Sequence, residues 1–164
     1  MGRVKITRGQ RSPLVEIMAM IFSKTTGYGI RALAYLAKQR PQRICGLQEI
    51  AEHERIPPVF LRKVLGELRR HRLLRSVKGK HGGYDLERAP ESITLWEVYR
   101  LLEPNPDLDM CILGYGVCHP ENPCSMHEDW QRLRQEFIKV AQSKTVLDMT
   151  DPRHTRNSSV LLNI

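Results

Sequence analysis

At 164 residues, the chain has room for one ordinary domain and a modest additional element. Hydrophobic residues make up 41% and charged residues 27%, which excludes wholesale disorder and permits a packed core. No stretch approaches the roughly 20 apolar residues that cross a membrane. The apolar run over residues 14–22 is too brief for a signal peptide. We therefore expect a cytoplasmic protein with no membrane partner.

The formal net charge of +8 favours a polyanionic partner, and the distribution of the charge is more informative than its sum. Residues 55–81 hold nine Lys or Arg and one acid, Glu67. Residues 97–136 hold eight acids and three bases. A basic middle followed by an acidic second half indicates a binding face that is joined to a different kind of element.

The first half of the chain predicts helices followed by a hairpin. Residues 1–19 lack a sustained apolar period and are expected to be a flexible leader. Ser23 can cap a helix that Pro41 closes, and a short helix is expected after Gly46. The stretch 58–70 has one apolar stripe and Pro in its first turn. Two short apolar runs then flank a glycine-rich connection, which predicts a hairpin over residues 73–86.

The second half predicts two more helices separated by a long loop. Residues 94–103 have helical periodicity, and the loop that follows, 104–124, is rich in Gly and Pro. Ser125 and Glu128 have the spacing of a capping box, so a last long helix is expected over 125–148. Its apolar residues alternate steps of three and four, a seam typical of paired helices: Met126, Trp130, Leu133, Phe137 and Val140. Residues 149–164 are expected to be a flexible tail.

The order helix, short helix, turn, helix, hairpin predicts a mainly α winged helix-turn-helix domain over residues 20–103. It would carry a small β-hairpin wing and precede a long C-terminal dimerisation helix. The helix over 58–70 would enter the major groove, where Arg62 can bind guanine bidentately. Basic neighbours would contact phosphates. The complete set of candidate DNA contacts is Lys24, Val59, Arg62, Lys63, Arg69, Arg70, Lys78, Lys80 and His81.

Three cysteines in the loop 104–124 form the pattern C-x6-C-x5-C: Cys111, Cys118 and Cys124. His127 follows Cys124 at the spacing C-x2-H, in the first turn of the expected helix. Thiolates are soft ligands for iron–sulfur clusters, and imidazole can complete such a set. A structural zinc site of the Cys3His type accepts the same ligands. A thiol switch without metal is a third interpretation.

These features together resemble the IscR- and NsrR-type regulators of the Rrf-two family. The resemblance covers about residues 20–148, and its most specific parts are the wing and the cysteine loop. It is carried by residues 23–38 (SKTTGYGIRALAYLAK), 47–51, 56–57, 60–74, the wing 76–86 (SVKGKHGGYDL), the three loop cysteines and Trp130.

The resemblance implies a symmetric homodimer that binds a palindromic double-stranded operator and acts as a transcription regulator, here expected to be a repressor. It implies an iron–sulfur cluster on Cys111, Cys118 and Cys124, with [2Fe-2S] favoured over [4Fe-4S] and His127 as the fourth ligand. Such a cluster would sense redox state, nitric oxide or iron and cluster supply. Gly27 stands where NsrR-like members have a ligating aspartate, which argues against that ligand. The first cysteine gap is one residue longer than the usual five.

An enzyme is not expected. The sequence has no glycine-rich nucleotide loop, no G-x-S-x-G nucleophile elbow and no H-E-x-x-H zinc motif. The clustering of three thiols fits metal binding better than a single cysteine nucleophile.

Overall fold

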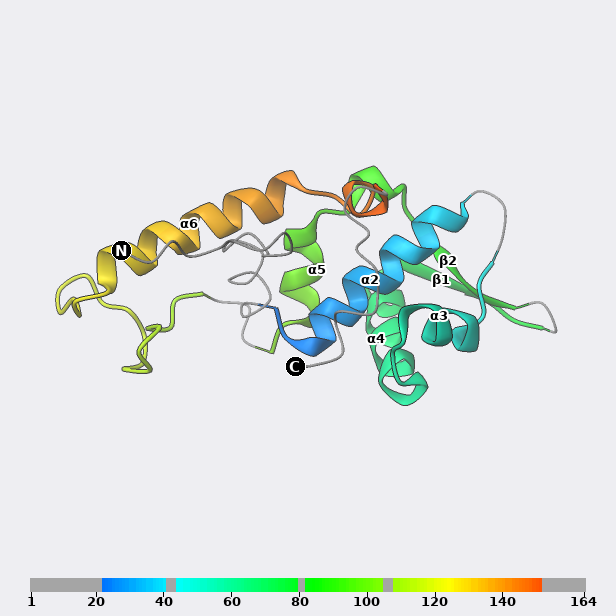
Figure 1. Cartoon of the computed structure of the whole chain (residues 1–164), viewed down its shortest axis with the longest axis horizontal. Coiled ribbons are helices and arrows are strands. Elements are labelled where there is room, and N and C mark those ends of the chain that lie inside the picture. The colour runs from blue at the N-terminus through cyan, green and yellow to red at the C-terminus, as the bar shows by residue number, and fades with distance from the viewer. Residues whose placement is uncertain (1–21, 41–43, 80–81, 105–107, 152–164) are drawn as a thin grey trace, which may run out of the picture.

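The computed structural model describes residues 22–40, 44–79, 82–104 and 108–151. The expected leader 1–19 and residues 152–164 of the expected tail lie outside these ranges. The expected mainly helical fold with a small hairpin is confirmed (Figure 1). In chain order, the elements are α2 (Lys24–Gln39), α3 (Leu47–Glu54), α4 (Pro58–Arg70), β1 (Leu74–Val77), β2 (Gly83–Leu86), the 3-10 turn η1 (Pro90–Ser92), α5 (Leu95–Leu102), α6 (His127–Ser143) and η2 (Asp148–Thr150).

Local sequence signals explain where most of the helices begin. Ser23 caps α2, because its hydroxyl accepts a hydrogen bond from the Thr26 backbone N–H at 3.3 Å. Thr94 caps α5 in the same way through the N–H of Glu97. Pro58 is the first residue of α4, a position whose N–H has no partner within the helix, so proline loses no hydrogen bond there. These caps set the starts of the three helices that build the core.

The core lies between α2, α3, α4 and the wing. Apolar residues of α4 at helical spacing, Leu61, Val64, Leu65 and Leu68, are buried against α2. Burial of such a stripe removes it from water and is the main stabilising term for a helix of this length. The core continues through a further set of buried side chains: Ala32, Leu33, Leu36, Ile50, Ala51, Ile56, Leu73, Leu74, Leu86, Ile93, Val98, Leu102 and Val146.

The wing is an antiparallel hairpin that is anchored at its base. Arg75 pairs with Asp85, and Ser76 pairs with Tyr84. Two backbone hydrogen bonds join Tyr84 to Cys45, at 2.8 and 3.0 Å, so the hairpin is held to the segment that precedes α3. Cys45 is fully buried in the main core, just before the start of α3.

Helix α6 extends away from the winged domain and packs against α5 (Figure 1). Phe137 and Ala141 are buried against α5, and the Phe137 ring meets Tyr99 edge-on at 5.3 Å between centroids. The helix begins at His127, not at Ser125, and its N-cap residue Met126 makes no side-chain cap hydrogen bond. The expected capping box is therefore wrong. A turn closed by the His127 N–H on the Cys124 carbonyl precedes the helix instead.

The segment after α6 returns to the winged domain. Helix α6 ends at Ser143, and the Val146 side chain is fully buried in the main core. Backbone hydrogen bonds join Leu95 to Lys144 at 2.8 Å and Val146 to Ile93 at 2.9 Å. The segment that follows α6 is therefore bonded to the start of α5 and packed into the main core. Helix α6 itself is shorter than the expected 125–148.

Candidate functional site

Helix α4 presents an exposed basic face opposite its buried stripe. Arg62, Lys63, Arg69 and Arg70 are exposed, as expected for residues that contact DNA. Val59 is 68% exposed at the start of the helix. Such an arrangement suits an element that lies in the major groove, because base edges and phosphates are then both within reach.

The wing and α2 hold the other candidate DNA contacts. Lys78 is exposed at the end of β1, while Lys80 and His81 lie outside the described residues. Arg69 of α4 donates to the Ser76 hydroxyl of β1 at 3.4 Å, so α4 and the wing are adjacent. Lys24 is exposed on the first residue of α2, a different element from α4 and the wing.

The cysteine loop is folded, although it contains no helix or longer strand within residues 108–124. A short antiparallel bridge joins Met110 to Val117 and closes a tight turn between them. Gly114 and Gly116 have φ values of 79° and 92°, which side chains with a Cβ rarely adopt. The Cys111 N–H donates to the Gly116 carbonyl at 2.6 Å, which fixes the first cysteine on this turn.

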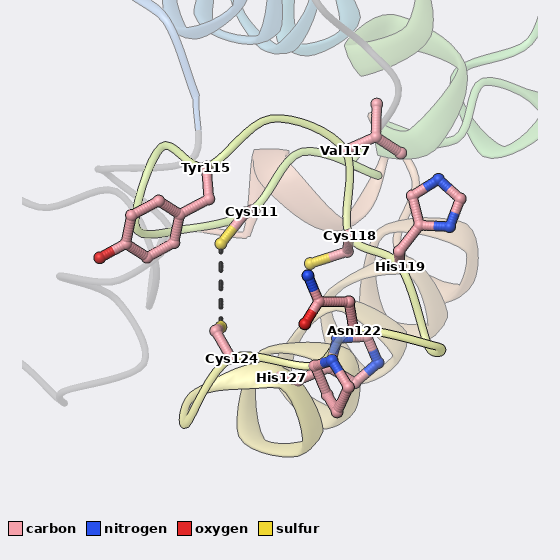
Figure 2. Close-up of a pocket in the computed structure, with 9 residues that line it drawn as sticks. Cys111, Tyr115, Val117, Cys118, His119, Asn122, Cys124 and His127 are labelled. Carbon is pink, nitrogen blue, oxygen red and sulfur yellow. Dashed lines mark hydrogen bonds between the residues drawn. The ribbon is translucent and has the colours of Figure 1, made fainter.

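All three loop cysteines and His127 line one open pocket of about 370 Å³ at the start of α6. Figure 2 shows the three sulfur atoms turned toward a shared space, while the His119 ring points away from them. The Sγ atoms of Cys111 and Cys124 lie 3.9 Å apart. The fold thus brings together three thiols and one imidazole that are separated along the sequence.

The environment of the first cysteine favours its thiolate form. Hydrogen bonds from the backbone N–H groups of Leu113 and Tyr115 lower the pKa of the Cys111 thiol. Desolvation raises the pKa of Cys118, and the nearby Cys111 raises it further. A metal ion would reverse that second effect, because a cation favours the charged form of both thiols.

The donor set fits a thiolate-bound metal centre. Two thiolates on one tetrahedral metal, each at roughly 2.3 Å, lie about 3.8 Å apart, and the Cys111–Cys124 pair has nearly this spacing. Within the ranges that the structure describes, no three Cys, His, Asp or Glu side chains are close enough together to hold a metal ion. A metal site built on this pair would therefore require further side chains to move closer, and Cys118 and His127 line the same pocket.

Three contacts that the sequence did not indicate connect this loop to the rest of the molecule. The Trp130 indole donates to the Met110 carbonyl at 2.9 Å, and Arg134 donates to the Leu108 carbonyl at 2.9 Å. Just before the loop, the Glu103 carboxylate accepts hydrogen bonds from the Ser23 backbone N–H and the Thr26 hydroxyl at the start of α2. Sequence spacing gives no signal for these contacts, because each joins residues at least 20 positions apart.

Comparison with known proteins agrees with this architecture. A 37% identical relative from Aquifex aeolicus (strain VF5), aligned over 132 residues, carries the name "Putative HTH-type transcriptional regulator"; the match covers 79% of this chain and 91% of the relative. The solved structure of CymR, the global cysteine regulator of B. subtilis, is 28% identical with a TM-score of 0.68, covering 79% of this chain and 95% of its own. The structure of T. potens IscR is 26% identical with a TM-score of 0.63, covering 81% and 88%.

The fold and its basic face define a winged-helix transcription regulator that binds DNA. Residues 22–152 match the Rrf2 family, whose description is iron-dependent transcriptional regulator. The chain belongs to this family, which consists of regulators and not of enzymes. In the described part of the chain, no helix is long and apolar enough to cross a membrane.

Proposed function

We propose that the chain is a homodimeric repressor whose operator binding is modulated by an iron–sulfur cluster. The observation that carries the proposal is the gathering of Cys111, Cys118, Cys124 and His127 around one pocket. These four side chains would hold the cluster, with [2Fe-2S] favoured and [4Fe-4S] as the second possibility. The cluster, when bound, supplies reactivity toward oxidants and nitric oxide.

The dimer part of the proposal is supported by the surface of α6. Phe137 of the expected seam is buried within its own protomer, but Leu133 and Val140 remain 40% and 39% exposed. Met126 is 36% exposed on the same side of the helix. An apolar row on a helix that projects from its domain is suited to pairing with a second copy. Two protomers would then place two α4 helices on the half-sites of a palindromic operator, roughly 34–36 Å apart.

Hydrogen bonds near the start of the loop suggest how a change in the loop would affect the DNA-binding face. Trp130 and Arg134 fasten residues 108–110 to α6, which would set the geometry of the dimer. Glu103, immediately before the loop, is bonded to α2, which packs directly on α4. A change in loop conformation would therefore shift both the dimer helix and the support of the recognition helix. Because both α4 helices of a dimer must fit their half-sites at once, a small rotation of one protomer relative to the other would change the operator affinity.

A second candidate is a winged-helix regulator that uses a thiol switch or a structural zinc ion. The 3.9 Å approach of the Cys111 and Cys124 sulfur atoms favours it, because a modest movement would allow a disulfide. The similarity to the cysteine regulator CymR, which has also been solved in an oxidized form from Staphylococcus aureus, is in line with redox control by thiols. The same four side chains would serve as zinc ligands.

Metal analysis separates these candidates. We expect the anaerobically purified full chain to be coloured and to contain iron and acid-labile sulfide, and we expect Cys111→Ala to lose both. Cys45→Ala is the matched control, because Cys45 is buried in the main core and should leave the metal content unchanged. A colourless protein with one zinc ion per chain would contradict the cluster, as would a metal-free protein that forms a Cys111–Cys124 disulfide.

A further inference from the structure

The exposed face of α4 contains a glycine that the fold does not require. Gly66 is the ninth of the 13 residues of α4, within the helix and not at either cap. An added Cβ at Gly66 would meet no atom within 4 Å, and its φ is not positive. Glycine weakens a helix interior relative to alanine, because it leaves the unfolded backbone more freedom. Neither packing nor backbone conformation therefore explains its presence.

Gly66 is partly exposed and lies on the side of α4 away from the core. Leu61, Val64, Leu65 and Leu68 form the buried side of α4. The opposite side is a row at helical spacing that consists of Val59, Lys63, Gly66 and Arg70. Lys63 and Arg70 are exposed one turn before and one turn after the glycine. Gly66 is thus a gap in the side-chain cover of the helix, with a cationic side chain on each side of it.

We propose that the sugar–phosphate backbone of bound DNA packs directly against the α4 backbone at Gly66. Glycine at this position then serves the docked complex, because it lets a phosphate strand approach the helix more closely than any Cβ would permit. Lys63 and Arg70 are placed to contact phosphates on either side of that approach. A contact with the DNA backbone contributes affinity to every sequence alike, whereas Arg62 nearby has the geometry to read a base.

The other helical glycines differ from Gly66 either in packing or in their place in the fold. Gly29 of α2 faces its own core, where an added Cβ would lie 2.2 Å from Leu102 Cδ1. Gly27, also in α2, has open space around it like Gly66, but it lies outside the basic face of α4. Gly27→Ala is therefore a matched control for the intrinsic effect of replacing glycine in a helix.

The test compares stability with DNA affinity in the full-length protein. The probes are a duplex selected by the wild-type protein from a random library and a scrambled duplex of equal length. We expect Gly66→Ala to raise Tm by about 2–4 °C. We expect the same variant to bind both duplexes about tenfold more weakly. Gly27→Ala should raise Tm similarly and bind as the wild type does.

Three outcomes would overturn the inference. Unchanged affinity of Gly66→Ala would show that DNA does not approach this position. A lower Tm would show that the fold itself needs the glycine. If Gly66→Ala bound only the selected duplex more weakly, the variant would be affecting base recognition and not a contact with the sugar–phosphate backbone. The inference rests on the proposed docking of α4, which is tested separately by Arg62→Ala and Lys63→Ala. If neither of these weakens binding, the proposed role of α4 fails with it.

Discussion

The carboxylate of Glu103 accepts a hydrogen bond from the Thr26 hydroxyl, with 2.5 Å between Oε2 and Oγ1. Glu103 ends α5 at the point where the cysteine loop begins, and Thr26 lies fully buried in the first turn of α2. The same carboxylate accepts from the Ser23 backbone N–H at 3.1 and 3.2 Å. The first turn of α2 has no acidic residue of its own, so Glu103 supplies the negative charge that favours a helix N-terminus.

Removal of this carboxylate should loosen both elements that it joins. We predict that Glu103→Ala lowers the free energy of unfolding by about 1–2 kcal/mol, because the buried Thr26 hydroxyl loses its acceptor. Urea denaturation measures the change. Glu87→Ala, a substitution of an exposed acid, should stay within about 0.5 kcal/mol of the wild type. Equal stability of the two variants would show that the contact does not support α2.

The base of the wing depends on a close approach of two backbones. An added Cβ at Gly83 would lie 2.3 Å from the Cys45 carbonyl oxygen, which is backbone and cannot rotate away. We predict that Gly83→Ala disrupts the Cys45–Tyr84 bridge and lowers the free energy of unfolding by about 2–4 kcal/mol. Ser76→Ala, on the exposed part of β1, provides the control. Similar Tm values for the two variants would contradict the predicted clash.

The buried carboxylate of Asp85 forms ion pairs with two arginines at the wing. Asp85 lies 2.7 Å from Arg75 and 3.3 Å from Arg40, and it also accepts the Leu86 backbone N–H at 2.8 Å. Its side chain is only 10% exposed. We predict that Asp85→Ala lowers the free energy of unfolding by about 2 kcal/mol. The loss is smaller than for a fully buried ion pair, because both arginines keep contact with water.

A double-mutant cycle would isolate the Asp85–Arg75 pair. Arg75→Ala alone should lower the free energy of unfolding by no more than about 1 kcal/mol, since its side chain is 58% exposed. The two substitutions should be non-additive, because they remove the same ion pair. Strict additivity would mean that the pair contributes nothing and that Asp85 acts through Arg40 and Leu86.

Base reading and phosphate binding should be separable by substitution. We predict that Arg62→Ala weakens binding by about 1–3 kcal/mol and relaxes the preference at one base position. Lys78→Ala should weaken binding to all sequences alike and reduce the salt slope by about one. Gel-shift titrations at several salt concentrations measure both effects. If neither substitution alters affinity, the assigned DNA contacts are wrong.

The sequence predicted the winged domain well because its signals are local. The Ser23 cap, the α4 stripe of Leu61, Val64, Leu65 and Leu68, and the glycine-rich hairpin each depend on residues close together in the chain. The exposure of Arg62 and Lys63 followed directly from that stripe. The gathering of the three cysteines was also expected, although their spacing alone left iron–sulfur, zinc and thiol chemistry open.

Features that depend on a competing local turn or on distant contacts could not be predicted. The start of α6 was placed at Ser125 from a local capping pattern, but the turn from Cys124 to His127 takes precedence there. Phe137 fits a dimer seam by its spacing, yet α5 provides an aromatic partner within the same protomer. The return of residues 144–151 to the core depends on pairing with residues 90–95, which no local period indicates.

The most direct test of the proposed function is the operator affinity of one preparation before and after nitric oxide treatment. The protein is purified anaerobically, its iron content is measured, and binding to the selected duplex is titrated in both states. We predict about a tenfold or greater change in affinity for the wild type and none for Cys111→Ala, which lacks one of the proposed ligands. Equal affinity of the wild-type protein before and after loss of its cluster would contradict the claim that the cysteine loop controls DNA binding.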